Sequence, residues 1–350
     1  FDMGFLNDRL KLEVDFFKRK RSGIPATPTD IIYPYEAGYS VQKQNLNSDQ
    51  VSGIDGMVRW NDRVNDFNYF VGVNLTLARQ KTINNYGEVF LNGWDQYRWA
   101  QTNRWSNVKN GAVWMWETIG VFQTQEEIDN YPVNIDGANN VNLRPGDLIF
   151  KDVNGDGLID DYDKRPLGYA ATDYDWDSGN ANKNPLLSMG INLGFEYKGI
   201  DFAADFAGGF MNTFIGDWHV KYGIGTDQMG YVYNVIDSWQ HEDIFDTKSP
   251  WKRGKFPAVR SNNPSIRDWN DFYAKEINYL RLRNLVVGYT LPIKWTKKAL
   301  IQKLRVYFEG SNLLCWDSLN DFGFDPEISS VTGFDYPQHK VYTVGVNVTF

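Results

Sequence analysis

Apolar and polar residues alternate with a period of two in several segments of the chain. The alternation is clearest at 342–350, where Tyr, Val and Phe residues alternate with Thr, Gly and Asn. Successive side chains of a β-strand point to opposite faces of a sheet, so each such segment predicts a strand with one apolar and one polar face. The other alternating segments are 9–18, 67–79, 189–197 and 201–206.

Two architectures fit this period. In a soluble sandwich the apolar faces would meet in a core, whereas in an outer-membrane barrel they would touch lipid and the polar faces would line a lumen. The predicted strands are about as long as the 9–11 residues that cross a tilted barrel wall. Short connections, as at 198–199, alternate with very long ones, at about 81–185 and 207–273. Both features favour an antiparallel transmembrane β-barrel with long extracellular loops.

Composition narrows the function classes. The 350 residues carry a formal net charge of −8, which argues against nucleic acid as a partner. No run of about 18 uncharged apolar residues is present, as a transmembrane helix would need. The single cysteine, Cys315, excludes an internal disulfide framework and a cysteine-based zinc site. Residues 1–12 do not resemble a signal peptide, so we expect a mature or clipped piece of a longer chain.

Catalytic signatures are missing from the sequence. The three histidines, His219, His241 and His339, lie far apart and do not have metalloprotease spacing. No nucleophile elbow, P-loop or dinucleotide fingerprint is present. The acidic pair Asp325 and Glu327 flanks a proline, which we interpret as fixing a loop turn. We therefore expect that the chain is not an enzyme.

The segment 152–163 has the ligand spacing of an EF-hand calcium loop, with Gly157 at the position where the chain turns sharply. An aspartate stands at the last ligand position, where an EF-hand has glutamate, and its shorter side chain weakens bidentate binding. The alternative is an acidic turn held by hydrogen bonds between its side chains and its backbone. We expect a structural calcium ion. The predicted ligands are Asp152, Asn154, Asp156, Leu158, Asp160 and Asp163.

Aromatic residues are abundant, with 13 Trp, 20 Tyr and 22 Phe. Trp94, Tyr97, Trp99 and Trp105 cluster in one predicted loop and are the candidate substrate-binding residues. Aromatic rings stack on sugar rings, while neighbouring Asp and Asn side chains bind hydroxyl groups, so this loop suits an oligosaccharide. The alternative is that these residues pack the loop or belong to an aromatic belt at the membrane interface.

Several stretches together resemble the SusC/RagA family of TonB-dependent outer-membrane transporters. Their order and combination make the resemblance specific, and it spans the whole chain. Segment 5–10 also resembles a hairpin from the middle of these barrels. The motif-bearing stretches are 145–160 (PGDLIFKDVNGDGLID), 279–292 (YLRLRN to GYTLP), 304–313 (LRVY to GSNL) and 323–350 (GFDPE to the final VTF).

The resemblance implies that residues 1–350 form the C-terminal portion of a transmembrane antiparallel β-barrel of about 22 strands. At about 10 residues a strand plus loops, this length supplies about a dozen strands. The N-terminal plug domain and the TonB box would then lie outside this chain. Open sheet edges are not tolerated in lipid, so the rest of the barrel must come from another segment or another chain.

The resemblance also implies a function in the outer membrane of a Gram-negative bacterium. A protein of this family would import oligosaccharides under a SusD-like surface lipoprotein lid, driven by TonB acting on the plug. A peptide ligand, as in the RagA branch, is the first alternative. The second alternative is a secreted β-protein that binds glycans with calcium. Detergent dependence would separate this second alternative from a barrel that contacts the lipid bilayer.

Overall fold

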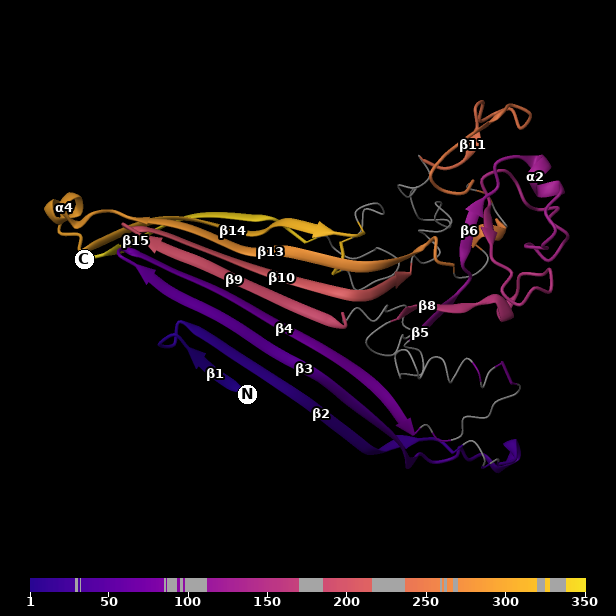
Figure 1. Ribbon diagram of the computed structural model, residues 1–350, viewed down its shortest axis with the longest axis horizontal. Coiled ribbons are helices and arrows are strands. Elements are labelled where there is room, and N and C mark those ends of the chain that lie inside the picture. The colour runs from indigo at the N-terminus through magenta and orange to yellow at the C-terminus, as the bar shows by residue number, and fades with distance from the viewer. Residues whose placement is uncertain are drawn as a thin grey trace.

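The computed structural model describes residues 1–28, 31, 33–84, 86, 93–94, 97, 112–169, 185–215, 237–258, 260, 263–266, 270–319, 325–327 and 338–350. One antiparallel sheet of nine strands dominates these residues (Figure 1), in the order β1-β2-β3-β4-β9-β10-β13-β14-β15. The strands are β1 (Asp2–Phe5), β2 (Leu10–Ala26), β3 (Gln44–Val64), β4 (Phe67–Asn84), β9 (Leu187–Tyr197), β10 (Ile200–Ile215), β13 (Ala274–Thr290), β14 (Lys303–Asp317) and β15 (Val341–Thr349).

The register of the strands aligns their apolar positions across the sheet. Directly paired residues form one continuous apolar line over seven strands, and a parallel line of polar and small residues runs beside it. The apolar line is Leu12, Val58, Val73, Ile191, Phe206, Leu282 and Leu314. The polar line is Lys11, Arg59, Gly72, Asn192, Asp205, Asn284 and Ser311. The sheet therefore has one apolar face and one polar face.

The apolar face is exposed. Val344 is 75% accessible, Trp316 is 55% accessible, and Val58 and Val71 are each more than 40% accessible. Within the described residues the nine strands form a single layer (Figure 1), with no second sheet packed on the apolar face. A soluble protein rarely exposes so large a continuous apolar surface. The sandwich, in which apolar faces meet in a core, is therefore not the architecture of this sheet.

Charged and small residues occupy the polar face. Asp201 and Arg305 form an ion pair across β10, β13 and β14, with Arg305 Nε 2.9 Å from Asp201 Oδ1. Gly288 lies between them, and a Cβ atom there would stand 2.5 Å from Asp201 Oδ1. The missing side chain thus makes room for the pair. Gly345 of β15 likewise leaves room for a neighbouring side chain, the ring of Tyr307.

All short connections of the sheet lie at one end, and the long connections lie at the other (Figure 1). The tight turns use backbone with positive φ, as at Asn65 and at Lys198–Gly199. The helices are short, and none in the described part of the chain is long and apolar enough to cross a membrane. They are η1 (Tyr35–Ala37), α2 (Gln125–Asp129), η2 (Asp161–Asp163), η4 (Pro264–Ile266), α4 (Ile293–Thr296) and η5 (Lys297–Ala299).

In the described part of the chain nine strands form the sheet, whereas the chain length predicts about a dozen. The difference arises because the long connections after β4 and β10 contain short strands that pair outside the sheet. These strands are β5 (Ala112–Met115), β6 (Thr118–Val121), β7 (Leu148–Phe150), β8 (Arg165–Tyr169), β11 (Gln240–His241) and β12 (Trp251–Lys252). They pair as β5 with β8, β6 with β7, and β11 with β12.

Candidate functional site

The two long connections fold together into a small body at one end of the sheet, which we call the loop cap. It comprises the described residues of 112–169 and 237–273 (Figure 1). Both connections contribute to one hydrophobic core, so these segments are packed rather than structureless. The buried core residues are Trp116, Phe122, Ile128, Ile135, Leu143, Leu148, Ile149, Phe150, Ile159, Phe256 and Tyr273.

Polar contacts join the two connections around this core. Asp147 has no exposed surface and accepts from both terminal nitrogens of Arg260, with Nη1 at 2.8 Å from Oδ1. The Leu148 N–H donates to Ser265 Oγ at 2.8 Å. A buried carboxylate is stable only when charge and hydrogen bonds compensate its lost hydration, and Arg260 supplies both. The cap is therefore held by an ion pair as well as by apolar packing.

Asp136 organises the turn between α2 and β7. Its carboxylate accepts from the backbone N–H groups of Ala138, Asn140 and Asn142, at 2.7 to 2.9 Å. Burial alone would raise the pKa of Asp136, but these three donors favour the charged form and lower the pKa below its ordinary value. The turn is therefore stabilised by the ionised side chain.

The acidic segment 152–163 is built around two carboxylates. Asp163 has no exposed surface and accepts from the N–H groups of Val153 and Asp160 at 2.8 and 2.9 Å. Asp152 accepts from Gly155 at 2.6 Å and from Gly157 at 2.8 Å. These bonds close the loop at both ends. The loop therefore has the side-chain-to-backbone hydrogen bonds expected for an acidic turn.

The remaining predicted calcium ligands make similar local contacts. Asp156 accepts from the Leu158 N–H at 2.9 Å and from the Asn154 side-chain amide at 2.8 Å. Asp160 caps η2 by accepting from the Tyr162 N–H. The oxygen-rich donor set has calcium chemistry, but in the described part of the chain no three His, Cys, Asp or Glu side chains converge as metal ligands. The calcium site stays a prediction.

Two of the four candidate substrate-binding aromatics lie against the end of this acidic segment. Trp94 and Tyr97 stack on each other with ring centroids 5.3 Å apart, and Trp94 also lies 5.3 Å from the ring of Tyr162. Trp114 packs edge-on against both. The Trp94 indole N–H is buried and has no hydrogen-bond partner among the described residues. Trp99 and Trp105, the other two candidates, lie outside the described residues.

The sequence alone did not identify Tyr162 and Arg165 as neighbours of this aromatic cluster. The Arg165 guanidinium lies 5.8 Å from the centre of the Trp94 ring. Tyr97 and Tyr162 are 41% and 47% accessible, so the cluster keeps an exposed aromatic surface. These residues are separated by more than sixty positions and share no period, so only the fold of the cap brings them together. Exposed rings beside a cation and free polar groups can bind sugars or peptide side chains.

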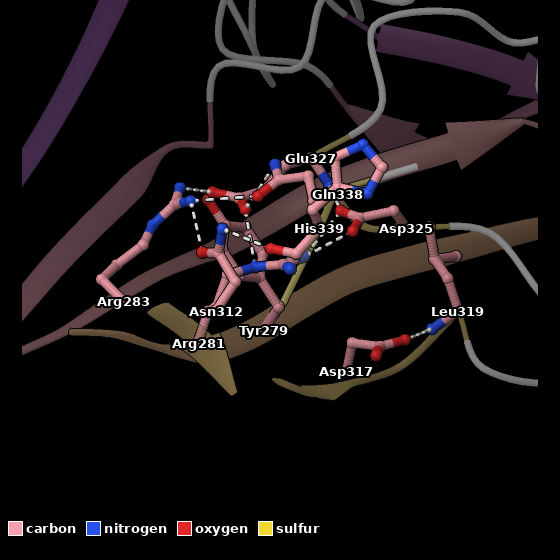
Figure 2. Close-up of polar contacts among 10 residues, drawn as sticks. All are labelled: Tyr279, Arg281, Arg283, Asn312, Asp317, Leu319, Asp325, Glu327, Gln338 and His339. Atoms are coloured by element: carbon pink, nitrogen blue, oxygen red, sulfur yellow. Dashed lines mark hydrogen bonds and ion pairs between the residues drawn. The ribbon is translucent and has the colours of Figure 1, made fainter. Parts of the chain in front are cut away.

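A second polar cluster lies on the polar face of the sheet, where residues 325–327, between β14 and β15, lie against β13 (Figure 2). Arg281 is 4% accessible, and one of its terminal nitrogens donates to both carboxylate oxygens of Asp325 at 2.6 and 2.7 Å. Its Nε lies 2.8 Å from Glu327 Oε2, an ion pair without the angle of a hydrogen bond. Arg283 pairs with the other oxygen of Glu327, to which the Tyr279 hydroxyl also donates.

Other connections complete this cluster, which we call the arginine latch (Figure 2). Gln338, just before β15, donates to Glu327 and accepts from Arg283 at 3.3 Å. Asn312 has positive φ, at the position where the β13–β14 register shifts, and accepts from Arg283. Asp325 and Glu327, expected only to flank a turn, are therefore the acceptors that hold residues 325–327 against the polar face of the sheet.

Three curated relatives match the whole chain: the TonB-dependent receptors P3, P26 and P39 of Formosa agariphila, at 24%, 24% and 23% identity. The chain is a relative of TonB-dependent receptors. The predicted resemblance is confirmed at this level. No family model matches the chain. The chain spans about a third of the length of these relatives, with 33 to 35% of each covered.

Two solved structures show the same fold. The structure of the RagAB peptide transporter matches with a TM-score of 0.62 and 22% identity, over 99% of this chain and 34% of that chain. The RagAB peptide importer in its 'closed-closed' state matches with a TM-score of 0.63, also at 22% identity, over 100% of this chain and 34% of that chain. The predicted all-β antiparallel fold is confirmed, and β1 and β15 are the two edges of the open sheet.

Proposed function

We propose that this chain forms part of the wall and the outer mouth of a TonB-dependent importer in the outer membrane of a Gram-negative bacterium. The exposed apolar face of the nine-stranded sheet is the observation that carries the proposal. Exposed valines and a tryptophan on one face suit hydrocarbon, while the ion pairs on the other face suit a water-filled interior. In the complete protein, the remaining barrel and plug would pair with the edges β1 and β15.

The proposed cargo is an oligosaccharide, which would bind at the exposed aromatic surface of Trp94, Tyr97 and Tyr162. Flat rings stack on the C–H faces of sugars, and the exposed rings of Tyr97 and Tyr162 offer such faces on either side of Trp94. Import of peptides is the alternative, favoured by the likeness to the RagAB peptide importer. Arg165 beside the rings would suit a peptide carboxylate.

The proposed mechanism is conformational and involves no bond chemistry, so we propose no enzymatic activity. A SusD-like surface lipoprotein would cover the mouth and trap the ligand, and TonB would act through the plug to open the lumen. A ligand shifts such a motion only by binding one state better than the other. The relatives support a receptor of this class, while the lid and the cargo are part of the proposal.

Uptake by the full-length transporter tests this function. A deletion strain is supplied with fluorescent oligosaccharides or fluorescent peptides, and accumulation is compared with the complemented strain and with a strain that lacks TonB. The proposal expects TonB-dependent oligosaccharide uptake that falls at least tenfold in Trp94→Ala/Tyr97→Ala. Trp316→Ala, on the apolar face, is the matched aromatic control. Uptake of peptides alone would support the alternative, and uptake without TonB would contradict the proposed function.

A further inference from the structure

The hairpin of residues 240–252 exposes two large apolar side chains at its tip. It consists of β11 and β12, and β11 lies at the long-connection end of the molecule, opposite α4 (Figure 1). Ile244 is 69% accessible and Phe245 is 91% accessible. Adjacent exposed apolar side chains of this size are one of the features of protein–protein contact sites. We call this segment the tip hairpin.

The tip is rigid because its polar residues fix the backbone. The Asp243 N–H donates to Ser249 Oγ, whose hydroxyl donates back to the Asp243 carbonyl. The Asp243 carboxylate accepts from the Phe245 N–H at 2.9 Å, which holds Phe245 at the tip. The Ser249 N–H donates to the Asp246 carbonyl at 3.0 Å. The exposed side chains are therefore held by an ordered turn.

The stem of the hairpin is equally well fixed. The rings of His241 and Trp251 lie 4.1 Å apart, and His241 Nδ1 lies 2.6 Å from the Ser249 carbonyl. At the base, Trp239 is 6% accessible and packs on Gly146, where any Cβ atom would collide with the indole. The Trp239 N–H donates to the carbonyl of Phe256, which belongs to the cap core. The tip hairpin is thus a pre-organised projection from the cap.

Charge on the hairpin indicates what kind of partner it fits. Glu242, Asp243 and Asp246 lie within two positions of the apolar tip, whereas the two lysines of the hairpin, Lys248 and Lys252, lie further along the chain; all five residues are exposed. Acidic groups repel the anionic head groups of a membrane surface, which argues against insertion into lipid. They favour instead a protein pocket with a basic rim. Rigid apolar anchors of this kind contribute most of the binding energy in many protein interfaces, because little ordering is needed on binding.

We propose that Ile244 and Phe245 of the tip hairpin enter an apolar pocket, ringed by basic side chains, on the surface lipoprotein that covers the mouth. This inference rests on the proposed function and adds the point of contact. The hairpin projects from the end of the sheet at which the long connections gather, where a lid would sit (Figure 1). The acidic side chains would guide the lid to the pocket, and the two apolar side chains would hold it.

The test uses the full-length transporter, co-expressed with its SusD-like lipoprotein and purified in detergent. Ile244→Ser/Phe245→Ser is expected to weaken binding of the purified lipoprotein about thirtyfold, as for two interface anchors. Glu242→Lys/Asp246→Lys should slow association and reduce its dependence on salt. Val141→Ser and Ile119→Ser, which remove exposed apolar residues elsewhere on the cap, are the controls and should bind normally.

A photo-crosslinking residue at position 245 provides a second measurement that does not depend on affinity. The inference expects a crosslink to the lipoprotein in the assembled complex, competed by excess free lipoprotein. If the unmodified transporter binds no lipoprotein, the part of the proposed function that assigns a lipoprotein partner is wrong. If the lipoprotein binds but the double Ser variant binds equally well, or if position 245 crosslinks only to lipid or to cargo, the tip-hairpin inference is wrong while the proposed function stands.

Discussion

Breaking the arginine latch should release the connection after β14 from the polar face of the sheet. Arg281→Met leaves the Asp325 carboxylate without its arginine partner and removes one of the two arginines that pair with Glu327, while these carboxylate side chains are only 20% and 12% accessible. Removing one partner of a buried ion pair costs about 3–5 kcal/mol. Because water still reaches both carboxylates, we use a smaller value of about 2 kcal/mol, which corresponds to a roughly thirtyfold larger open population.

The single cysteine of the chain is a natural reporter for this opening. Cys315 pairs in register with Arg281 and is partly buried. When closing is faster than modification, the alkylation rate follows the open population. Maleimide labelling of Cys315 in the purified full-length protein, read by mass spectrometry of its peptide, should therefore be about thirtyfold faster in Arg281→Met.

Two further variants separate opening from intrinsic thiol reactivity. Since a nearby cation favours the reactive thiolate, Arg281→Met alone could slow the chemistry at Cys315. Asp325→Asn/Glu327→Gln keeps that cation and should also accelerate labelling. Arg305→Met breaks a similar pair ten residues away along β14, about 33 Å, and should leave labelling unchanged. Labelling within twofold of the unmodified protein in both latch variants would refute the reasoning.

Three other predictions concern the loop cap. Phe122→Ala empties a fully buried core position and should cost about 3–5 kcal/mol, seen as faster hydrogen exchange of cap amides with the sheet unchanged. The pKa of Asp136 is lower in the folded protein than in the unfolded chain. The ionised carboxylate therefore stabilises its turn fully above about pH 4, and this stabilisation is lost as the pH falls through the folded-state pKa. Asp136→Ala should therefore remove this part of the acid dependence of exchange in its turn. If calcium binds 152–163, adding it should slow exchange in that loop, and Asp152→Ala/Asp156→Ala should abolish the difference; identical exchange with calcium and with EGTA would contradict the site.

Period-two alternation predicted those strands whose sequences alternate regularly between apolar and polar residues. The expected segments 189–197 and 342–350 correspond to β9 and β15 within two residues. The alternation did not predict β3, because Ser, Asp and Gly residues interrupt it there. Hydrogen bonding to β2 and β4 on its two sides holds this strand in the sheet. Local pattern is a weak signal where tertiary pairing decides.

The candidate site was predicted less completely than the fold. The acidic loop and the aromatic segment could be recognised from spacing and composition, yet their contact through Tyr162 depends on how the cap folds. The arginine latch was missed because its partners, Arg281 and Glu327, are 46 positions apart and each is unremarkable alone. Contacts between distant segments leave no local signature in a single sequence.

The apolar line across seven strands has a consequence for biogenesis. In the proposed outer-membrane barrel, insertion of β9 one residue out of register would turn Asn192 and Glu196 toward lipid and Ile191 and Leu193 toward the lumen. A basic side chain on the lipid face costs about 2–4 kcal/mol at the middle of the bilayer, and an acidic one near the end of a strand, such as Glu196, costs less. The bilayer would therefore disfavour a strand paired in the wrong register during barrel assembly, because the misfolded intermediate would be less stable in lipid than the correctly paired one.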